Sequence, residues 1–439
     1  MTDAARLPAD RDVWRIALPM ILSNISVPLL GMVDTAVTGH LDGPEYLGAV
    51  AIGSMLFGII YVGFNFLRMG TTGIAAQRFG ARDFDGLRTT LGQALIVAWL
   101  IAFTLLLLQS VIANVGLPLL GAEGAIGTLG DIYFSIRIWS APATLASYVL
   151  IGWFIGLQNA RIPLLIVIVI NSVNIVLDLV FVLVFGMDVD GVALASVIAE
   201  YTGVVIGLVF AVRVLREHPG HWLVERFTRL GEYGAFFAVN ANLFVRTLAL
   251  MFTMSFVTAQ GARMGPLVLA ANSVLMQFMN LSAFGLDGIA HAAEALVGKS
   301  FGEKHREGLK RAVALSLKWS AIFAAGFSLA FLLGGQLLIN VLTDLDDVRE
   351  TARTYLPWLV ALPVVAVWSY LYDGVYVGAT RAAEMRNIML IASFAVFLPA
   401  WFILRPFENH GLWAAFLLFL LARGVGMHLL YRPRVLDQL

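Results

Sequence analysis

One stretch of this chain occurs twice. Phe79–Arg88 reads FGARDFDGLR, and Phe301–Lys310, which lies 222 positions later, reads FGEKHREGLK. Phe, both Gly and Leu recur in register, and three charged positions keep the sign of their charge. The same offset pairs Gly156 with Gly378. A constant offset over such a distance indicates that the chain contains two copies of one structural unit.

The repeated unit is strongly apolar. Hydrophobic residues make up 59% of the chain and charged residues 13%, with a mean hydropathy of +0.84, which is well above the values of soluble domains. The apolar stretches between polar breaks are about 20 residues or longer, which is the length that a helix needs to cross a membrane. The regular alternation typical of a membrane β-barrel is absent from the sequence. We therefore predict an all-α integral membrane protein.

Polar breaks divide each half into six spans, so we expect twelve transmembrane helices in two six-helix lobes. The predicted N-terminal lobe covers residues 1–220 and the C-terminal lobe residues 221–439. An even number of spans puts both termini on one side, and that side collects most of the basic residues. The positive-inside rule makes that side cytoplasmic, and six spans per copy predict parallel repeats about a pseudo-twofold axis. The opposite side holds only Arg263, Arg349, Arg353 and Arg405.

Two acids fall in the outer half of the first lobe. Asn171, Asn174 and Asp178 are spaced i, i+3 and i+7, so they lie on one helix face. At about 1.5 Å per residue, Asp178 is roughly 24 Å from the cytoplasmic start of its span. Asp34 is roughly 9 Å from the external end of the first span. We expect the two carboxylates to face one another inside the lobe.

The second copy lacks these polar residues. At the constant offset, Ser393, Val396 and Ala400 replace the two Asn and the Asp of the fifth span. A helix contact required by the fold is expected in both copies, so the difference favours a coupling-ion site over a structural polar network. The predicted site comprises Asp34, Asp178, Asn174 and Asn171.

This site suits either of two coupling ions. Carboxylate and amide oxygens can hold Na⁺ at Asp34, Asn174 and Asp178, with Thr35 nearby, and two buried carboxylates can equally share a proton. Pro28 stands six residues before Asp34 and interrupts the backbone hydrogen bonding of the first span. It is either a hinge that bends the span when the ion binds or one of the prolines that membrane helices tolerate.

Other polar residues inside the spans carry weaker hypotheses. Glu200 lies near the membrane midplane, as a substrate contact or as the ion-pair partner of Arg137. Thr35 and Ser196 are further candidate substrate or secondary polar contacts. In the second lobe, Arg246 and Asp287 are predicted to form a structural ion pair.

Several classes of function are disfavoured by the sequence. It contains no cysteine and has a net charge of zero, so thiol catalysis is excluded and nothing indicates a nucleic-acid partner. His291 and Glu294 are too few for a metal centre, and no phosphate-binding glycine loop or catalytic triad motif appears. We expect neither an enzyme nor a cofactor or resident metal, apart from H⁺ or Na⁺ as coupling ion.

Five long stretches resemble the multidrug and toxic compound extrusion (MATE) family, and in particular its DinF-like branch. The resemblance implies two six-helix lobes, H⁺- or Na⁺-driven efflux of organic, often cationic or amphipathic compounds, and a bacterial cytoplasmic (inner) membrane location. It also implies that Asp34, Asn174 and Asp178 are polar cavity residues and that Pro28 is the bending point. The stretches are Pro28–Leu41, Phe66–Gly80, Asn171–Val182, Asp287–Gly302 and Asp373–Asn387.

Two kinds of transporter remain open at this point. The leading hypothesis is a monomeric secondary multidrug antiporter whose partners are small organic substrates and the lipid bilayer. The alternative is a flippase for lipid-linked oligosaccharides from the wider superfamily. Such a flippase would need cationic groups along its cleft, and the spans offer few: Arg68, Arg137, Arg246, Lys318 and Arg423.

Overall fold

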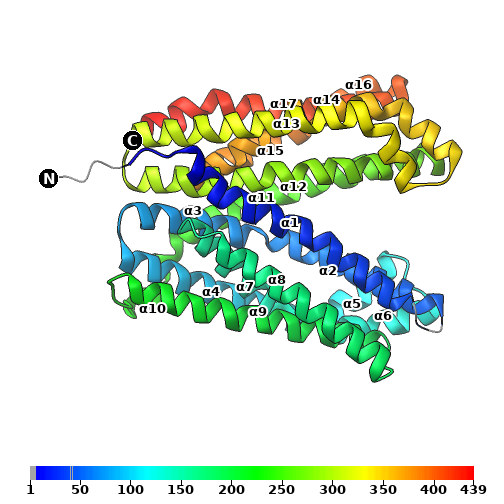
Figure 1. The fold of residues 1–439 in the computed structure, drawn as a ribbon, viewed down its shortest axis with the longest axis horizontal. Coiled ribbons are helices and arrows are strands. Elements are labelled where there is room, and N and C mark those ends of the chain that lie inside the picture. The colour runs from blue at the N-terminus through cyan, green and yellow to red at the C-terminus, as the bar shows by residue number, and fades with distance from the viewer. Residues whose placement is uncertain (1–5, 40, 42) are drawn as a thin grey trace. The chain divides into compact units, whose positions relative to one another are not determined.

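The computed structural model describes residues 6–39, 41 and 43–439, and the described residues contain helices and no strand. Helices of the first half are connected by short turns, and α8 continues into a π-helical segment, η2 (Leu179–Val184). The helices are α1 (Asp10–Thr38), α2 (Pro44–Phe64), α3 (Phe66–Gly80), α4 (Phe84–Leu107), α5 (Gln109–Leu119), α6 (Gly124–Arg137), α7 (Ala141–Gly156), α8 (Arg161–Asp178) and α9 (Val189–Glu217) (Figure 1).

The second half repeats this order with longer, less interrupted helices. A short α10 (Glu225–Thr228) precedes it, and a π-helical segment, η4 (Ile391–Phe397), joins α15 to α16. The remaining helices are α11 (Gly234–Arg263), α12 (Pro266–Gly302), α13 (Arg306–Leu342), α14 (Asp346–Gly378), α15 (Ala382–Leu390), α16 (Leu398–Leu404) and α17 (Glu408–Arg434) (Figure 1).

By length and apolar composition, eleven helical stretches of the described chain are able to cross a membrane. The last stretch, Ala382–Gln438, has 57 residues, which is enough for two crossings at about 20 residues each. It is divided at η5 (Arg405–Phe407). The prediction of an all-α membrane protein with twelve spans is therefore confirmed.

The chain forms two compact units. The first is Leu22–Phe236, and the second is Phe237–Leu439 together with the chain up to Ile21. The start of α1 is tied into the second unit by Asp10, which accepts hydrogen bonds from Lys318 (2.9 Å) and from the Trp319 indole (2.7 Å). Trp14 packs edge-on against the Trp319 ring. The lobe boundary placed at residue 220 stays a prediction.

The repeat extends to individual backbone contacts. A methyl group at Gly152 of α7 would lie 2.3 Å from the Arg68 carbonyl oxygen of α3, and one at Gly374 of α14 would lie 2.4 Å from the Ala290 carbonyl oxygen of α12. Both the glycines and the carbonyls are 222 positions apart. Small residues let membrane helices approach closely in this way. Each unit therefore contains the same tight helix crossing.

The turns that follow these helices also repeat their backbone. Arg82 and Lys304 have φ values of 54° and 53°, and Gln158 and Thr380 have values of 60° and 54°. Left-handed backbone is uncommon for residues other than glycine. Its recurrence at the same offset shows that the two copies share turn geometry as well as helix order.

Symmetry is broken where helices are interrupted. The stretch Pro44–Gly80 is divided at Asn65 and the stretch Gly124–Gly156 at η1 (Ile138–Ser140), whereas their counterparts α12 and α14 are continuous over 37 and 33 residues. Both interruptions lie in the first unit.

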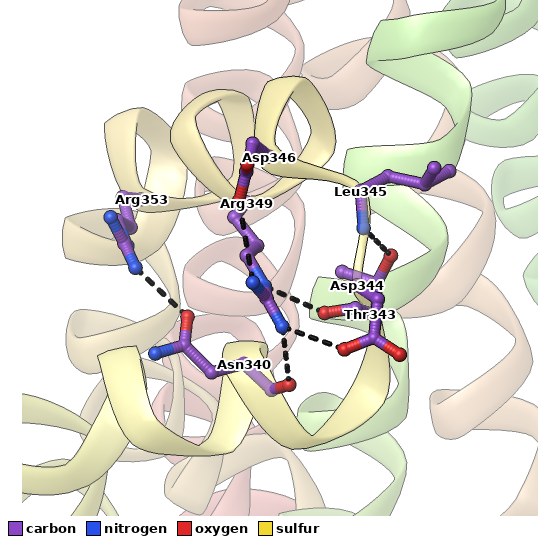
Figure 2. Close-up of polar contacts among 7 residues, drawn as sticks. All are labelled: Asn340, Thr343, Asp344, Leu345, Asp346, Arg349 and Arg353. Carbon is purple, nitrogen blue, oxygen red and sulfur yellow. Dashed lines mark hydrogen bonds and ion pairs between the residues drawn. The ribbon is translucent and has the colours of Figure 1, made fainter.

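Arg349 secures the turn between α13 and α14 in the second unit (Figure 2). It donates to the carbonyl oxygens of Thr343 (2.7 Å) and Asn340 (3.1 Å) and to the Asp344 carboxylate (2.9 Å), while Arg353 donates to the Asn340 side chain (2.8 Å). The last carbonyls of a helix lack intrahelical partners and attract cations. Arg349 therefore caps the C-terminus of α13.

Candidate functional site

Asp34 and Asp178 meet inside the first unit. Asp34 lies near the end of α1 and is 9% exposed, and Asp178 is the last residue of α8 and is fully buried. Their carboxyl groups lie within hydrogen-bonding reach of each other. The Oδ1 atom of each has no hydrogen-bond donor among the described residues. Two buried acceptors without a donor need a proton or a cation between them.

Asn174 belongs to this pair, whereas Asn171 does not contact it. Asn174 is buried one turn before Asp178 and donates from Nδ2 to the Asp178 Oδ2 atom at 2.7 Å. Asn171 instead donates to the Ser26 carbonyl oxygen (3.2 Å) and hydroxyl (3.1 Å) of α1. The four predicted residues therefore divide into a three-residue acidic site and a separate contact between α8 and α1.

The secondary candidates lie in different surroundings. Thr35 is exposed and donates to the Gly31 carbonyl oxygen of its own helix at 2.7 Å. Ser196 of α9 is buried, and its hydroxyl has no hydrogen-bond partner among the described residues. Glu200 follows Ser196 by one turn on the same face of α9. Pro28 is exposed, and α1 remains helical through it.

Arg137 of α6 has polar and aromatic neighbours inside the first unit. It is the last residue of α6 and donates to the Tyr133 hydroxyl and, at 3.5 Å, to Ser54. Its guanidinium lies 5.3 Å from the centre of the Phe57 ring, a favourable cation–π geometry. Its charge acts on Asp34, Asp178 and Glu200 alike.

Hydroxyl groups that the sequence analysis did not single out complete this cluster. Tyr133 and Ser54 are hydrogen-bonded at 2.9 Å, Tyr61 and Ser140 at 3.2 Å, and Thr144 of α7 lies close to Glu200. Ser140 belongs to η1, so one helix interruption of the first unit adjoins the cluster. Tyr and Ser are common in buried helices for packing reasons, and no sequence signal marks these ones.

The second unit contains a different charge cluster. Asp373 of α14 accepts hydrogen bonds from Arg246 of α11 and from Arg423 of α17, the latter at 2.7 Å. Both arginines are buried. The predicted pairing of Arg246 with Asp287 stays a prediction, and Asp373 is the partner that the structure establishes.

No group of three or more His, Cys, Asp or Glu side chains that could hold a metal ion occurs in the part of the chain that the structure describes. His291 and Glu294 lie 3.5 Å apart as an isolated pair. An open cavity in the second unit includes none of the predicted site residues. Its lining is Phe256, Gln260, Arg263, Met264, Trp401, Phe402, Arg405 and Glu408.

Comparison with known proteins identifies relatives over nearly the whole chain. The MatE family model matches residues 19–180 and 241–402. The chain is 41% identical over 424 residues to the DNA damage-inducible protein F of Escherichia coli strain K12, covering 97% of this chain and 92% of that protein. It is 24% identical over 428 residues to the probable multidrug resistance protein NorM of Rhizobium meliloti strain 1021, covering 92% and 89%.

A solved structure shares the fold. It is described as the outward-facing conformation of a multidrug resistance MATE family transporter of the MOP superfamily. It superposes with a TM-score of 0.86 at 19% sequence identity, covering 98% of this chain and 97% of that one. None of these relatives supports the flippase alternative.

Proposed function

Because this chain belongs to the MatE family, whose members are transporters and not enzymes, we propose that it is a secondary multidrug efflux antiporter. It exports organic, often cationic or amphipathic compounds in exchange for H⁺ or Na⁺. The coupling ion binds at Asp34 and Asp178 with the support of Asn174. The observation that carries this proposal is the buried pair of facing carboxyl groups, each with an oxygen that lacks a donor among the described residues.

The residues of the acidic site fit either ion. Two carboxylates and one amide are hard oxygen donors of the kind that Na⁺ accepts, and the close approach of the two carboxyl groups equally suits one shared proton. Asn174 already donates to Asp178 Oδ2, so it holds that carboxylate in place and leaves Oδ1 directed to the ion. Binding removes the repulsion between Asp34 and Asp178.

The proposed transport cycle alternates between an ion-bound and a substrate-bound state. A bound ion and a bound substrate stabilise different states of the transporter, so each promotes release of the other. Asp34 lies on α1, and Asn171 holds the middle of that helix through Ser26. Pro28, between Ser26 and Asp34, is the point at which loading of the acidic site would bend α1.

The location and cargo rest on the relatives. The E. coli and Rhizobium proteins are bacterial, and the name of the latter denotes multidrug resistance. We place this transporter in the bacterial inner membrane, as a monomer with both termini in the cytoplasm. Small organic compounds are its substrates.

The decisive experiment compares two gradients. Purified protein in liposomes is loaded with a fluorescent organic cation, and efflux is driven by a pH gradient alone or by a Na⁺ gradient alone. The gradient that drives efflux identifies the coupling ion. Asp34→Asn should abolish gradient-driven efflux, whereas Asp131→Asn, which alters an exposed acid on α6 of the same unit, should not. Full gradient-driven efflux by Asp34→Asn would refute the proposal.

A further inference from the structure

The open cavity of the second unit occupies the position that matches the acidic site of the first. Phe256 of its lining stands 222 positions after Asp34, and Trp401 directly follows Ala400, which matches Asp178. The cavity has a volume of about 310 Å³, which is within the range of pockets that bind small molecules. The second unit therefore has an open pocket where the first has a buried acidic site.

The charged and the aromatic lining residues are separated along the helix axes. Arg263 is the last residue of α11, and Arg405 begins η5, which divides the last long apolar stretch into two crossings. Helix ends and turns between crossings lie at a membrane surface. Phe256 is seven residues, or about 10 Å, from Arg263 along α11, and Trp401 precedes Arg405 by one turn. The cavity is therefore charged at the membrane surface and aromatic towards the membrane interior.

The aromatic part of the cavity is fixed by the hydrophobic core of the second unit. The Phe256 ring lies edge-on against Phe397, with 5.5 Å between the ring centres, and Phe397 is fully buried. Trp401 belongs to the same core. Phe402, which also lines the cavity, is 64% exposed, and Ile403 beside it is 74% exposed. In a membrane such apolar side chains face acyl chains, which are as apolar as they are.

The charged side chains of the cavity are not engaged by the rest of the described chain. Arg263, Arg405 and Glu408 are exposed, and their side chains form no hydrogen bond or ion pair with another described residue. Guanidinium groups match the geometry of a phosphate, and a carboxylate attracts an ammonium group. The rim therefore complements a molecule that carries both a phosphate and an amine.

The backbone at Glu408 is unfavourable for a glutamate. Its φ is 51° and its ψ is −126°, a conformation that glycine adopts readily and other residues rarely adopt. The matching residue of the first unit is Gly186, with a φ of 65°. Backbone strain of this kind is concentrated at sites that bind ligands. A glutamate at a position that favours glycine points to a use for its carboxylate.

We propose that this cavity binds a phospholipid with an amine-bearing head group. The phosphate lies between Arg263 and Arg405, and the ammonium group pairs with Glu408. The glycerol part lies against Phe256 and Trp401, and the acyl chains follow the exposed apolar surface beside the cavity. The lipid thereby links the end of α11 to η5. This inference goes beyond the proposed antiport and does not depend on which ion drives it.

Native mass spectrometry of the full chain in detergent tests the phosphate contacts. Titration with dioleoylphosphatidylethanolamine gives the dissociation constant of the lipid, and the double variant Arg263→Gln/Arg405→Gln should raise it about five- to thirtyfold. The control double variant Arg216→Gln/Arg353→Gln makes the same change of charge at exposed arginines that do not line the cavity, and it should leave the constant unchanged. A constant that is equal in Arg263→Gln/Arg405→Gln and the unaltered protein overturns the proposal.

The role of Glu408 is tested by comparing two lipids. The unaltered protein should bind dioleoylphosphatidylethanolamine about two- to fivefold more tightly than dioleoylphosphatidylglycerol, which lacks the amine. Glu408→Gly should remove this preference and unfold at no lower a temperature, because glycine suits this backbone. Glu350→Gln, at an exposed acid on α14, should keep the preference. Equal affinity of the unaltered protein for the two lipids, or a preference that survives in Glu408→Gly, overturns the assignment.

A soluble head group distinguishes a lipid from a free phosphate compound. Glycerophosphoethanolamine carries the same phosphate and amine without acyl chains, so it should bind far more weakly than the whole lipid. Binding as tight as that of the lipid overturns the assignment to a membrane component. All these measurements record binding without a gradient. Their failure leaves the proposed antiport standing, and retained efflux in Asp34→Asn would refute the antiport without affecting the lipid site.

Discussion

The tight crossing of α7 on α3 offers a quantitative test of the repeat. A methyl group at Gly152 would lie 2.3 Å from the Arg68 carbonyl oxygen, 3.1 Å from the Arg68 carbonyl carbon and 3.1 Å from its Cα atom. These atoms are backbone, so relief requires the helices to move apart. Overpacking of this kind costs about 1–3 kcal/mol. Gly152→Ala should therefore destabilise the protein.

A matched variant separates this cost from helix propensity. Gly58 lies in the interior of α2, and a methyl group there would have no neighbour within 4 Å. Exchanging Gly for Ala in a helix interior contributes about 0.5–1 kcal/mol of stability at either position. That contribution cancels when the two variants are compared. The difference between Gly152→Ala and Gly58→Ala should therefore equal the overpacking cost, about 1–3 kcal/mol.

Denaturant unfolding of purified protein in detergent measures this difference. Tryptophan fluorescence is a suitable signal because Trp153 is fully buried beside Gly152 and donates to the Leu87 carbonyl oxygen at 3.2 Å. Gly374→Ala should behave like Gly152→Ala, since its methyl group would lie 2.4 Å from a carbonyl oxygen of α12. Equal stability of Gly152→Ala and Gly58→Ala would refute the reasoning.

Two further predictions concern arginines that bind helix ends. Arg88 donates to the carbonyl oxygens of Leu215 (2.5 Å) and His218 (2.8 Å) at the end of α9. Arg88→Met should therefore lower the free energy of unfolding by about 1.5–3 kcal/mol. It should also make trypsin cleave the chain after α9 faster. Lys310→Met, which removes only an exposed contact with Glu307, should leave cleavage unchanged, and equal rates in the two variants would contradict this. Arg349→Gln should lower the free energy of unfolding by about 1–2 kcal/mol, because the last carbonyl groups of α13 lose their donor. Thermal unfolding measures this change. A midpoint temperature equal to that of Arg353→Gln would argue against the cap.

Much of the fold was predictable because its causes are local. Apolar stretches of membrane-spanning length predict the helices, and the constant offset predicts that the turns and crossings recur. The interruptions at Asn65 and Ile138–Ser140 were not predicted. Those segments are about as apolar as their continuous counterparts, so hydropathy does not mark the interruptions.

The candidate site was predictable in part for a geometrical reason. Spacing of i, i+3 and i+7 puts Asn171, Asn174 and Asp178 on one helix face. It does not show which of these side chains are close enough along the helix axis to contact one another. Asn171 lies seven residues, or about 10 Å, from Asp178, and this separation explains why it contacts Ser26 instead. The effect of Arg137 on Asp34 and Asp178 depends on how α6 packs near α1 and α8, and these helices are far apart in the sequence.

The second unit serves as an internal control for the first. Both units have the same helix order, the same left-handed turns and the same glycine-mediated crossings, so the scaffold is held constant while the interior differs. At matched positions one interior carries three acids and an arginine, and the other contributes to a hydrophobic core. The second unit has its own buried charges, Asp373 with Arg246 and Arg423, at other positions. The scaffold therefore does not require charge at the positions that match Asp34 and Asp178. This difference supports the exchange of protons or Na⁺ that we propose at Asp34 and Asp178, where the second unit has Phe256 and Ala400.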